Sequence, residues 1–231
     1  MVFLKRFLLL LALITVPVLL MSQEMTIEQS YLQQSIEHMI IREMSRGNNE
    51  SMKEVALEYI GNAIDRGNLS DEVRTALEFL STEGSLYITR ENGRITNDFP
   101  RIRSRAAAYL GNFQTVESKD ALIRIMRNEE RPEVLTEAIK SLSLVGIDEG
   151  GETVNRIIWE VDRFDRNNPN NLLVISAIEA FETFADINGY INPEALALLR
   201  RVMVGGGYTY NVRERARQSL DILIRLPPRN D

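Results

Sequence analysis

The chain of 231 residues contains no cysteine and a single histidine, His38. The absence of cysteine excludes disulfides, a thiol nucleophile, thiolate metal sites and a lipid-anchoring cysteine. One histidine cannot form a multi-histidine metal centre, and it argues against a histidine-dependent catalytic triad. We therefore expect no catalytic residue, no cofactor and no metal ion, and we predict that the protein is not an enzyme.

Basic residues are also in short supply, because 27 lysines and arginines face 33 aspartates and glutamates, for a net charge of −6. This balance excludes a generally basic protein that coats nucleic acid, so no nucleic-acid partner is expected. The composition, 44% hydrophobic and 26% charged, suits one or two packed domains and argues against a disordered chain.

The N-terminus reads as an export signal. Lys5 and Arg6 precede an apolar stretch, residues 7–21, which is the order of charge and hydrophobicity in a secretory signal. This stretch is about fifteen residues long, shorter than the roughly twenty that span a bilayer. We predict that residues 1–22 are a signal peptide and that the protein is exported, either to a periplasm or to the extracellular space. An uncleaved anchor, which would associate the protein with the envelope, is the alternative.

Beyond residue 22, apolar residues recur at helical rather than strand spacing. Residues 23–49 are predicted to hold one N-terminal helix that stops at Gly47. Ser70 and the pair Asn192-Pro193 are typical helix starts. Further helices are expected at 50–66, 70–82, 99–112, 117–128, 131–145, 150–164, 170–187, 192–204 and 211–226.

A repeat emerges when five alanines are aligned. A large apolar residue stands four positions before and four positions after each of them, so each helix presents a large–small–large face on which a neighbouring helix can approach closely. The five are Ala56, Ala106, Ala138, Ala177 and Ala216. Self-similarity at a spacing of a few tens of residues is typical of a solenoid.

The repeated segments carry a family resemblance. Residues 102–111, a second helix at 120–126 and the opening of the next unit at 132–134 resemble the HEAT repeat, particularly its short bacterial form. Residues 212–216 repeat the opening, and the resemblance extends over about 50–226. It implies a curved stack of antiparallel helix pairs used as a binding surface or scaffold, with no particular chemistry.

The middle units depart from the family pattern, since Leu135 and Val174 replace the arginine and Phe181 replaces the leucine. The predicted fold is nevertheless an all-α solenoid of antiparallel, HEAT-like helix pairs. Its repeat domain is assigned to residues 50–231.

One insertion, residues 84–98, interrupts the repeat. Two β-prone runs, 85–89 and 94–96, flank Asn92-Gly93, and this dipeptide is a strong hairpin signal because both residues tolerate positive φ. We predict a small β-hairpin that turns there and is a candidate contact element; a mobile loop is the alternative.

Other signals favour a structural role. The segment 186–192 resembles the middle of a calcium loop, but Phe184 and Ala195 would occupy the positions that calcium ligands require. We interpret it as a turn before the next helix. Trp159, beside two isoleucines, is predicted to lie in the core. Tyr208 and Tyr210 are expected to pack against the last helix, with exposed aromatic contacts as the alternative.

The candidate partner-binding residues are Arg124, Arg156 and Arg201. Each immediately precedes an apolar pair on the second helix of its repeat, so a stack of repeats would present them as a ladder on the concave face. Unpaired, they would bind an acidic segment of a protein or an anionic lipid head group. The alternative is that each pairs with a neighbouring carboxylate.

The function predicted from the sequence is that of an exported, non-enzymatic scaffold or adaptor that binds another protein. The alternative is a membrane-tethered structural or assembly component of an envelope complex, in which case the membrane contact is the uncleaved N-terminal segment. A third hypothesis, a hydrolase or lyase, rests only on analogy with proteins that carry this short repeat.

Overall fold

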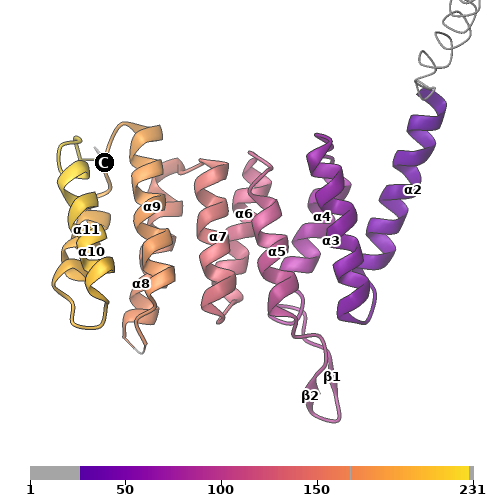
Figure 1. Cartoon of the computed structure of the whole chain (residues 1–231), viewed down its shortest axis with the longest axis horizontal. Coiled ribbons are helices and arrows are strands. Elements are labelled where there is room, and N and C mark those ends of the chain that lie inside the picture. Colours follow the sequence, from indigo (N-terminus) through magenta and orange to yellow (C-terminus); the bar gives the residue numbers. More distant parts are fainter. Residues whose placement is uncertain (1–26, 167, 229–231) are drawn as a thin grey trace, which may run out of the picture. The chain divides into compact units, whose positions relative to one another are not determined.

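The computed structural model describes residues 27–166 and 168–228 (Figure 1). Within these ranges the chain forms ten α-helices and one two-stranded hairpin, so the predicted all-α class is confirmed. The helices are α2 (Ile27–Ser45), α3 (Glu50–Asp65), α4 (Asp71–Thr82), α5 (Pro100–Leu110), α6 (Val116–Asn128), α7 (Pro132–Val145), α8 (Glu152–Asp165), α9 (Asn171–Asn188), α10 (Pro193–Val204) and α11 (Tyr210–Leu223). The predicted signal peptide, residues 1–22, lies outside the described residues.

The chain divides into two compact units, Met1–Glu37 and His38–Asp231. The described part of the first unit, residues 27–37, is helical and exposes the apolar side chains of Ile27, Leu32 and Ile36. The second unit contains the rest of α2, the helices α3 to α11 and the hairpin. None of the helices in the described ranges has the length and apolar character needed to cross a membrane.

The helices begin and end where the sequence signals indicate. The Ser70 side chain caps α4 by accepting a hydrogen bond from the Val73 backbone N–H at 3.4 Å. The Asn192 side chain caps α10, accepting from the Glu194 N–H at 2.9 Å. Gly189 ends α9 in the left-handed region, with φ of 71°, which a residue without a Cβ adopts at little cost. Each predicted helix from residue 50 onward matches an observed helix to within three residues at either end.

Within the second unit the helices pack in two series. The odd-numbered helices contact one another in succession, from α3 through α5, α7 and α9 to α11, and the even-numbered helices do so from α4 through α6 and α8 to α10. The five aligned alanines lie on the odd-numbered helices, and all of them are 0% exposed, as predicted. A methyl group at these positions leaves space for the neighbouring helix to approach.

Replacing Ala138, at the centre of α7, with leucine forces extra methylenes into this packed groove. We expect Ala138→Leu to lower the free energy of unfolding by about 1–3 kcal/mol in urea denaturation. Ala197→Leu is the matched control, because Ala197 lies exposed within α10 and the same side chain meets solvent there. Equal stability of the two variants would contradict the repeat alignment.

Candidate functional site

The three predicted arginines lie at corresponding places on successive even-numbered helices, Arg124 on α6, Arg156 on α8 and Arg201 on α10. Helix α6 contacts α8, and α8 contacts α10, so the three aligned arginines lie on helices that neighbour one another in the structure. The side chains of Arg124 and Arg201 are about half exposed, whereas only 18% of the Arg156 side chain is exposed.

Of the two interpretations left open by the sequence, the structure agrees with the one in which each arginine pairs with a carboxylate. Arg124 forms an ion pair with Glu78 of α4 at 3.0 Å, and Arg201 pairs with Asp162 of α8. Both carboxylates come from the preceding helix of the even series, which packs close enough for a long arginine side chain to reach. The guanidinium groups therefore tie neighbouring helices together, and exposed pairs of this kind contribute little stability.

Arg156 also reaches the preceding even-numbered helix, but through the backbone. Its guanidinium donates to the Met126 carbonyl oxygen of α6 at 3.2 Å and pairs with Glu160 on its own helix. The carbonyl lies in the last turn of α6, where carbonyl groups lack intrahelical donors. All three candidate residues thus have partners within the chain.

The prediction that Trp159 lies in the core is wrong. The residue is 48% exposed on the surface of α8 rather than buried. The core stripe of α8 runs through Val154, Ile157 and Val161, all nearly fully buried. Trp159 follows Ile157 by two residues, about 200° around a helix, and therefore points away from the core. The spacing of the stripe was the signal that could have placed it.

Two arginines flank the indole ring. The guanidinium carbon of Arg156 lies 4.3 Å from the ring centroid and that of Arg163 lies 5.6 Å away, which are cation–π distances. Glu160, which is 0% exposed, pairs with both arginines. Burial raises the pKa of the Glu160 carboxyl, against the opposing effect of the two positive charges. A buried carboxylate thus holds two guanidinium groups, and these hold the ring.

An open hollow of about 460 Å³ adjoins the ring, lined by Trp159, Asp162, Asp165, Arg166 and Arg201. The Asp165 side chain, which lines this hollow, is held in place because the hydroxyl of the buried Tyr208 donates a hydrogen bond to its carboxylate. Burial raises the pKa of Tyr208, and the adjacent carboxylate raises it further. Tyr208 is 8% exposed, so it is not an exposed aromatic contact, whereas Tyr210 is 71% exposed and the prediction that it is packed is wrong.

The predicted hairpin is present. Its strands, β1 (Arg90–Glu91) and β2 (Arg94–Ile95), pair antiparallel, with Arg90 opposite Ile95 and Glu91 opposite Arg94. Asn92 and Gly93 form the turn, both with positive φ, as the two-residue hairpin turn requires. The prediction of a hairpin turning at Asn92-Gly93 is confirmed.

The base of the hairpin is anchored by Arg103 of α5, which is 2% exposed. Its guanidinium donates to the Glu83 carbonyl oxygen at 3.2 Å, before the hairpin, and pairs with Asp98 at 2.9 Å, after it. It also pairs with the buried Glu129 at 2.6 Å. The Asn97 side chain adds a hydrogen bond to the Tyr87 carbonyl oxygen at 2.7 Å. The hairpin therefore leaves the helices from a fixed base.

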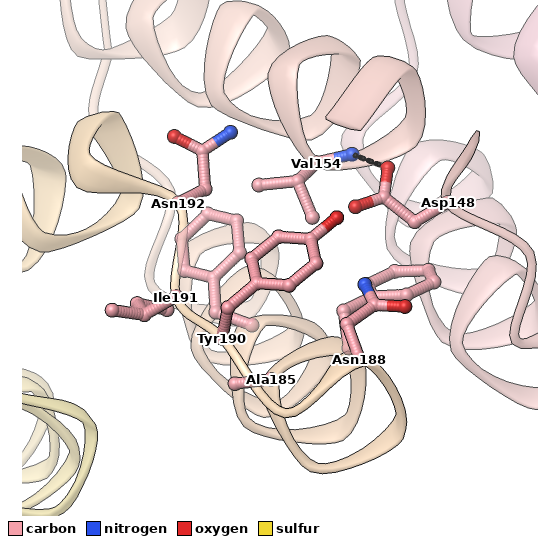
Figure 2. A pocket seen from close by; sticks show the side chains of 9 residues that line it. Asp148, Val154, Ala185, Asn188, Tyr190, Ile191 and Asn192 are labelled. Carbon is pink, nitrogen blue, oxygen red and sulfur yellow. Dashed lines mark hydrogen bonds between the residues drawn. The ribbon is translucent and has the colours of Figure 1, made fainter. Parts of the chain in front are cut away.

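The segment that resembles a calcium loop lines a small pocket in which Asp148 faces Tyr190 and Asn192 (Figure 2). The Asp148 carboxylate accepts hydrogen bonds from the backbone N–H groups of Thr153 at 2.9 Å and Val154 at 3.1 Å, at the start of α8. The pocket, about 10 Å³, has room for no more than a single water. Throughout the described part of the chain, no three histidine, cysteine, aspartate or glutamate residues cluster as metal ligands would.

Comparisons of the chain with protein-family models, with curated proteins and with solved structures find no match. Its function is therefore inferred from the geometry of the described residues. Two features of the described residues expose aromatic, apolar or charged side chains to solvent: the hollow beside Trp159 on α8, and the hairpin. Both resemble contact surfaces, on which aromatic and arginine side chains are enriched.

Trp159 is the single tryptophan of the chain, so fluorescence reports on this site directly. Because the ring is half exposed, we expect acrylamide to quench its emission readily in the folded protein, as a steep Stern–Volmer plot. Trp159→Phe serves as the blank. Quenching as weak as that of a core tryptophan would show that the ring is buried after all.

The Arg103 anchor gives a stability prediction. Arg103→Met leaves the buried Glu129 carboxylate without its partner, and we expect the free energy of unfolding to fall by about 3–5 kcal/mol in urea denaturation. The double variant Arg103→Met/Glu129→Gln removes both charges and should be less destabilised than the single variant. A double variant that loses the sum of the two single effects would contradict the coupling.

Proposed function

We propose that this protein is an exported, HEAT-like α-solenoid that binds another protein and acts as a scaffold or adaptor rather than as an enzyme. The two series of helix contacts support the solenoid, because antiparallel helix pairs stacked side by side would produce them. The buried alanines at aligned positions support a repeat. Export rests on the sequence pattern of residues 1–22 alone.

The observation that carries the binding function is the held, half-exposed ring of Trp159. Tryptophan and arginine are the residues most enriched among those that dominate binding energy at protein interfaces. The guanidinium groups of Arg156 and Arg163 both lie within cation–π distance of the ring, and Glu160 pairs with both. Side chains already fixed in the unbound protein lose little conformational entropy on association, so their contacts contribute more to affinity.

The hollow beside the ring favours an acidic segment of the partner. Asp162 and Arg201 neutralise each other there, and the Asp165 carboxylate accepts from Tyr208. Arg166 has no ion pair with any residue in the described ranges, which makes it the lining cation open to a carboxylate from outside. A partner with an acidic side chain beside an apolar one would engage Arg166 and the Trp159 ring together.

The test is a crosslinking pull-down from the native envelope, with bound proteins compared by mass spectrometry. We expect Trp159→Ala and Arg166→Glu each to lose the same specific partner, with affinity lowered at least about thirtyfold once that partner is purified. Tyr210→Ala is the matched control, because Tyr210 is a 71% exposed aromatic residue on α11, outside the hollow. Binding that survives both hollow variants would reject this surface.

A triple substitution of Arg124, Arg156 and Arg201 by glutamate is a poor test of the same surface. It would place new negative charges against Glu78, Glu160 and Asp162, and the fold would suffer from like-charge repulsion. Arg166→Glu breaks no ion pair found in the described ranges, but it adds a third carboxylate to the hollow lined by Asp162 and Asp165. Circular dichroism of each variant shows whether its helices are intact.

A further inference from the structure

The hairpin exposes apolar side chains that nothing in the second unit covers. Leu86, Tyr87, Ile88 and Ile95 are 39%, 58%, 48% and 40% exposed. In Figure 1 the hairpin extends away from the helices, from the connection between α4 and α5. Packing within the second unit therefore does not explain why these exposed residues are apolar. Their burial against another surface would be favourable.

The hairpin is also basic within an acidic chain. Arg90 and Arg94 are exposed beside the turn, and the exposed acidic residue of the hairpin is Glu91. Strand alternation and the pairing of Arg90 with Ile95 place Ile88, Arg90 and Ile95 on one face. This face combines apolar side chains with a cation at its outer end.

The positive charge continues into α5, where Arg101 and Arg105 are exposed in the first two turns. The first turn of this helix contains no acidic residue. A helix N-terminus favours negative charge, so arginines there gain nothing from the helix dipole. Arg101 has Glu54 at 4.0 Å, the limit of an ion pair, with 81% of its side chain exposed. The arrangement fits an external anion next to the base of the hairpin.

Two properties favour a membrane surface over a protein as the occupant. Four partly exposed side chains along a narrow projection offer far less than the roughly 800 Å² per partner of a stable protein interface. Apolar side chains flanked by arginines suffice for peripheral attachment, because burial in the headgroup region and attraction to anionic lipid act together. The anchored base means that insertion requires no rearrangement of the helices.

We propose that the hairpin, residues 86–96, is a peripheral membrane-contact element that lies flat on an anionic bilayer, with the side chains of Ile88 and Ile95 in the interfacial region. Arg90, which shares their face, then lies at the level of the lipid phosphates, where arginine donates hydrogen bonds to phosphate oxygens, and Arg94 adds positive charge at the same end of the hairpin. This contact is separate from the Trp159 hollow and independent of the function proposed for it.

The depth to which the hairpin enters the bilayer is measured with a tryptophan placed in the hairpin of the full chain. Ile88→Trp in a Trp159→Phe background is mixed with vesicles of phosphatidylglycerol and phosphatidylcholine, or of phosphatidylcholine alone. We expect a blue shift of the emission, and quenching by lipids brominated near the headgroup, with the anionic vesicles. Leu144→Trp in the same background is the control, because Leu144 is 62% exposed on α7 and lies outside the hairpin.

This readout separates the hairpin from the N-terminal apolar segment, which could bind vesicles by itself. If the emission of the Ile88→Trp variant is neither shifted nor quenched while the protein sediments with the vesicles, the proposal is overturned. Equal quenching of the Ile88→Trp and Leu144→Trp variants overturns it as well, since it would indicate general adsorption of the chain.

The contribution of the hairpin arginines to vesicle binding is tested by co-sedimentation at about 0.1 M salt. Arg90→Glu/Arg94→Glu is expected to lower the affinity for anionic vesicles at least about tenfold. Arg200→Glu/Arg225→Glu, two exposed arginines outside the hairpin, should leave it unchanged. Equal losses in the two double variants, or equal binding to neutral vesicles by the parent, would overturn the proposal. So would hairpin variants that lose a protein partner while still binding vesicles normally.

Discussion

A guanidinium group buried among helix ends must be matched by carboxylate and carbonyl oxygens, and Arg103 is the place where this constraint organises the molecule. Its partners are the Glu83 carbonyl oxygen just after α4, the Asp98 carboxylate two residues before α5 and the Glu129 carboxylate just after α6. Glu129 in turn accepts hydrogen bonds from the backbone N–H groups of Glu130 and Arg131, which lead into α7. One cation thus fixes the ends of four helices and both sides of the hairpin base.

The same use of charge recurs along the even-numbered helices. Arg124, Arg156 and Arg201 each reach the preceding helix, so their positive charge is engaged in holding neighbours together. These three arginines are therefore not available to bind a partner. The groups that remain available on α8 are the ring of Trp159 and the guanidinium of Arg166 beside the hollow.

The two outward-facing features are held by similar means. Buried Glu160 supports the arginines around Trp159, and buried Arg103 supports the base of the hairpin. In both cases a desolvated charge, which would be costly if unpaired, orders the residues that carry exposed aromatic or apolar groups. A protein contact at the hollow and a lipid contact at the hairpin would leave the chain able to hold a partner near a membrane surface.

The sequence by itself determined the local structure. Apolar periodicity, the caps at Ser70 and Asn192 and the Asn92-Gly93 turn specify short-range geometry, and burial of the aligned alanines followed from the large–small–large pattern. The ion-pair partners of the long side chains, in contrast, depend on the tertiary structure. An arginine spans several ångströms, so its partner is set by which helices lie side by side, and the pairing of Arg201 with Asp162 bridges 39 positions. The exposure of Trp159 has a different origin, because the apolar stripe of α8, Val154, Ile157 and Val161, already places the ring on the opposite side of the helix.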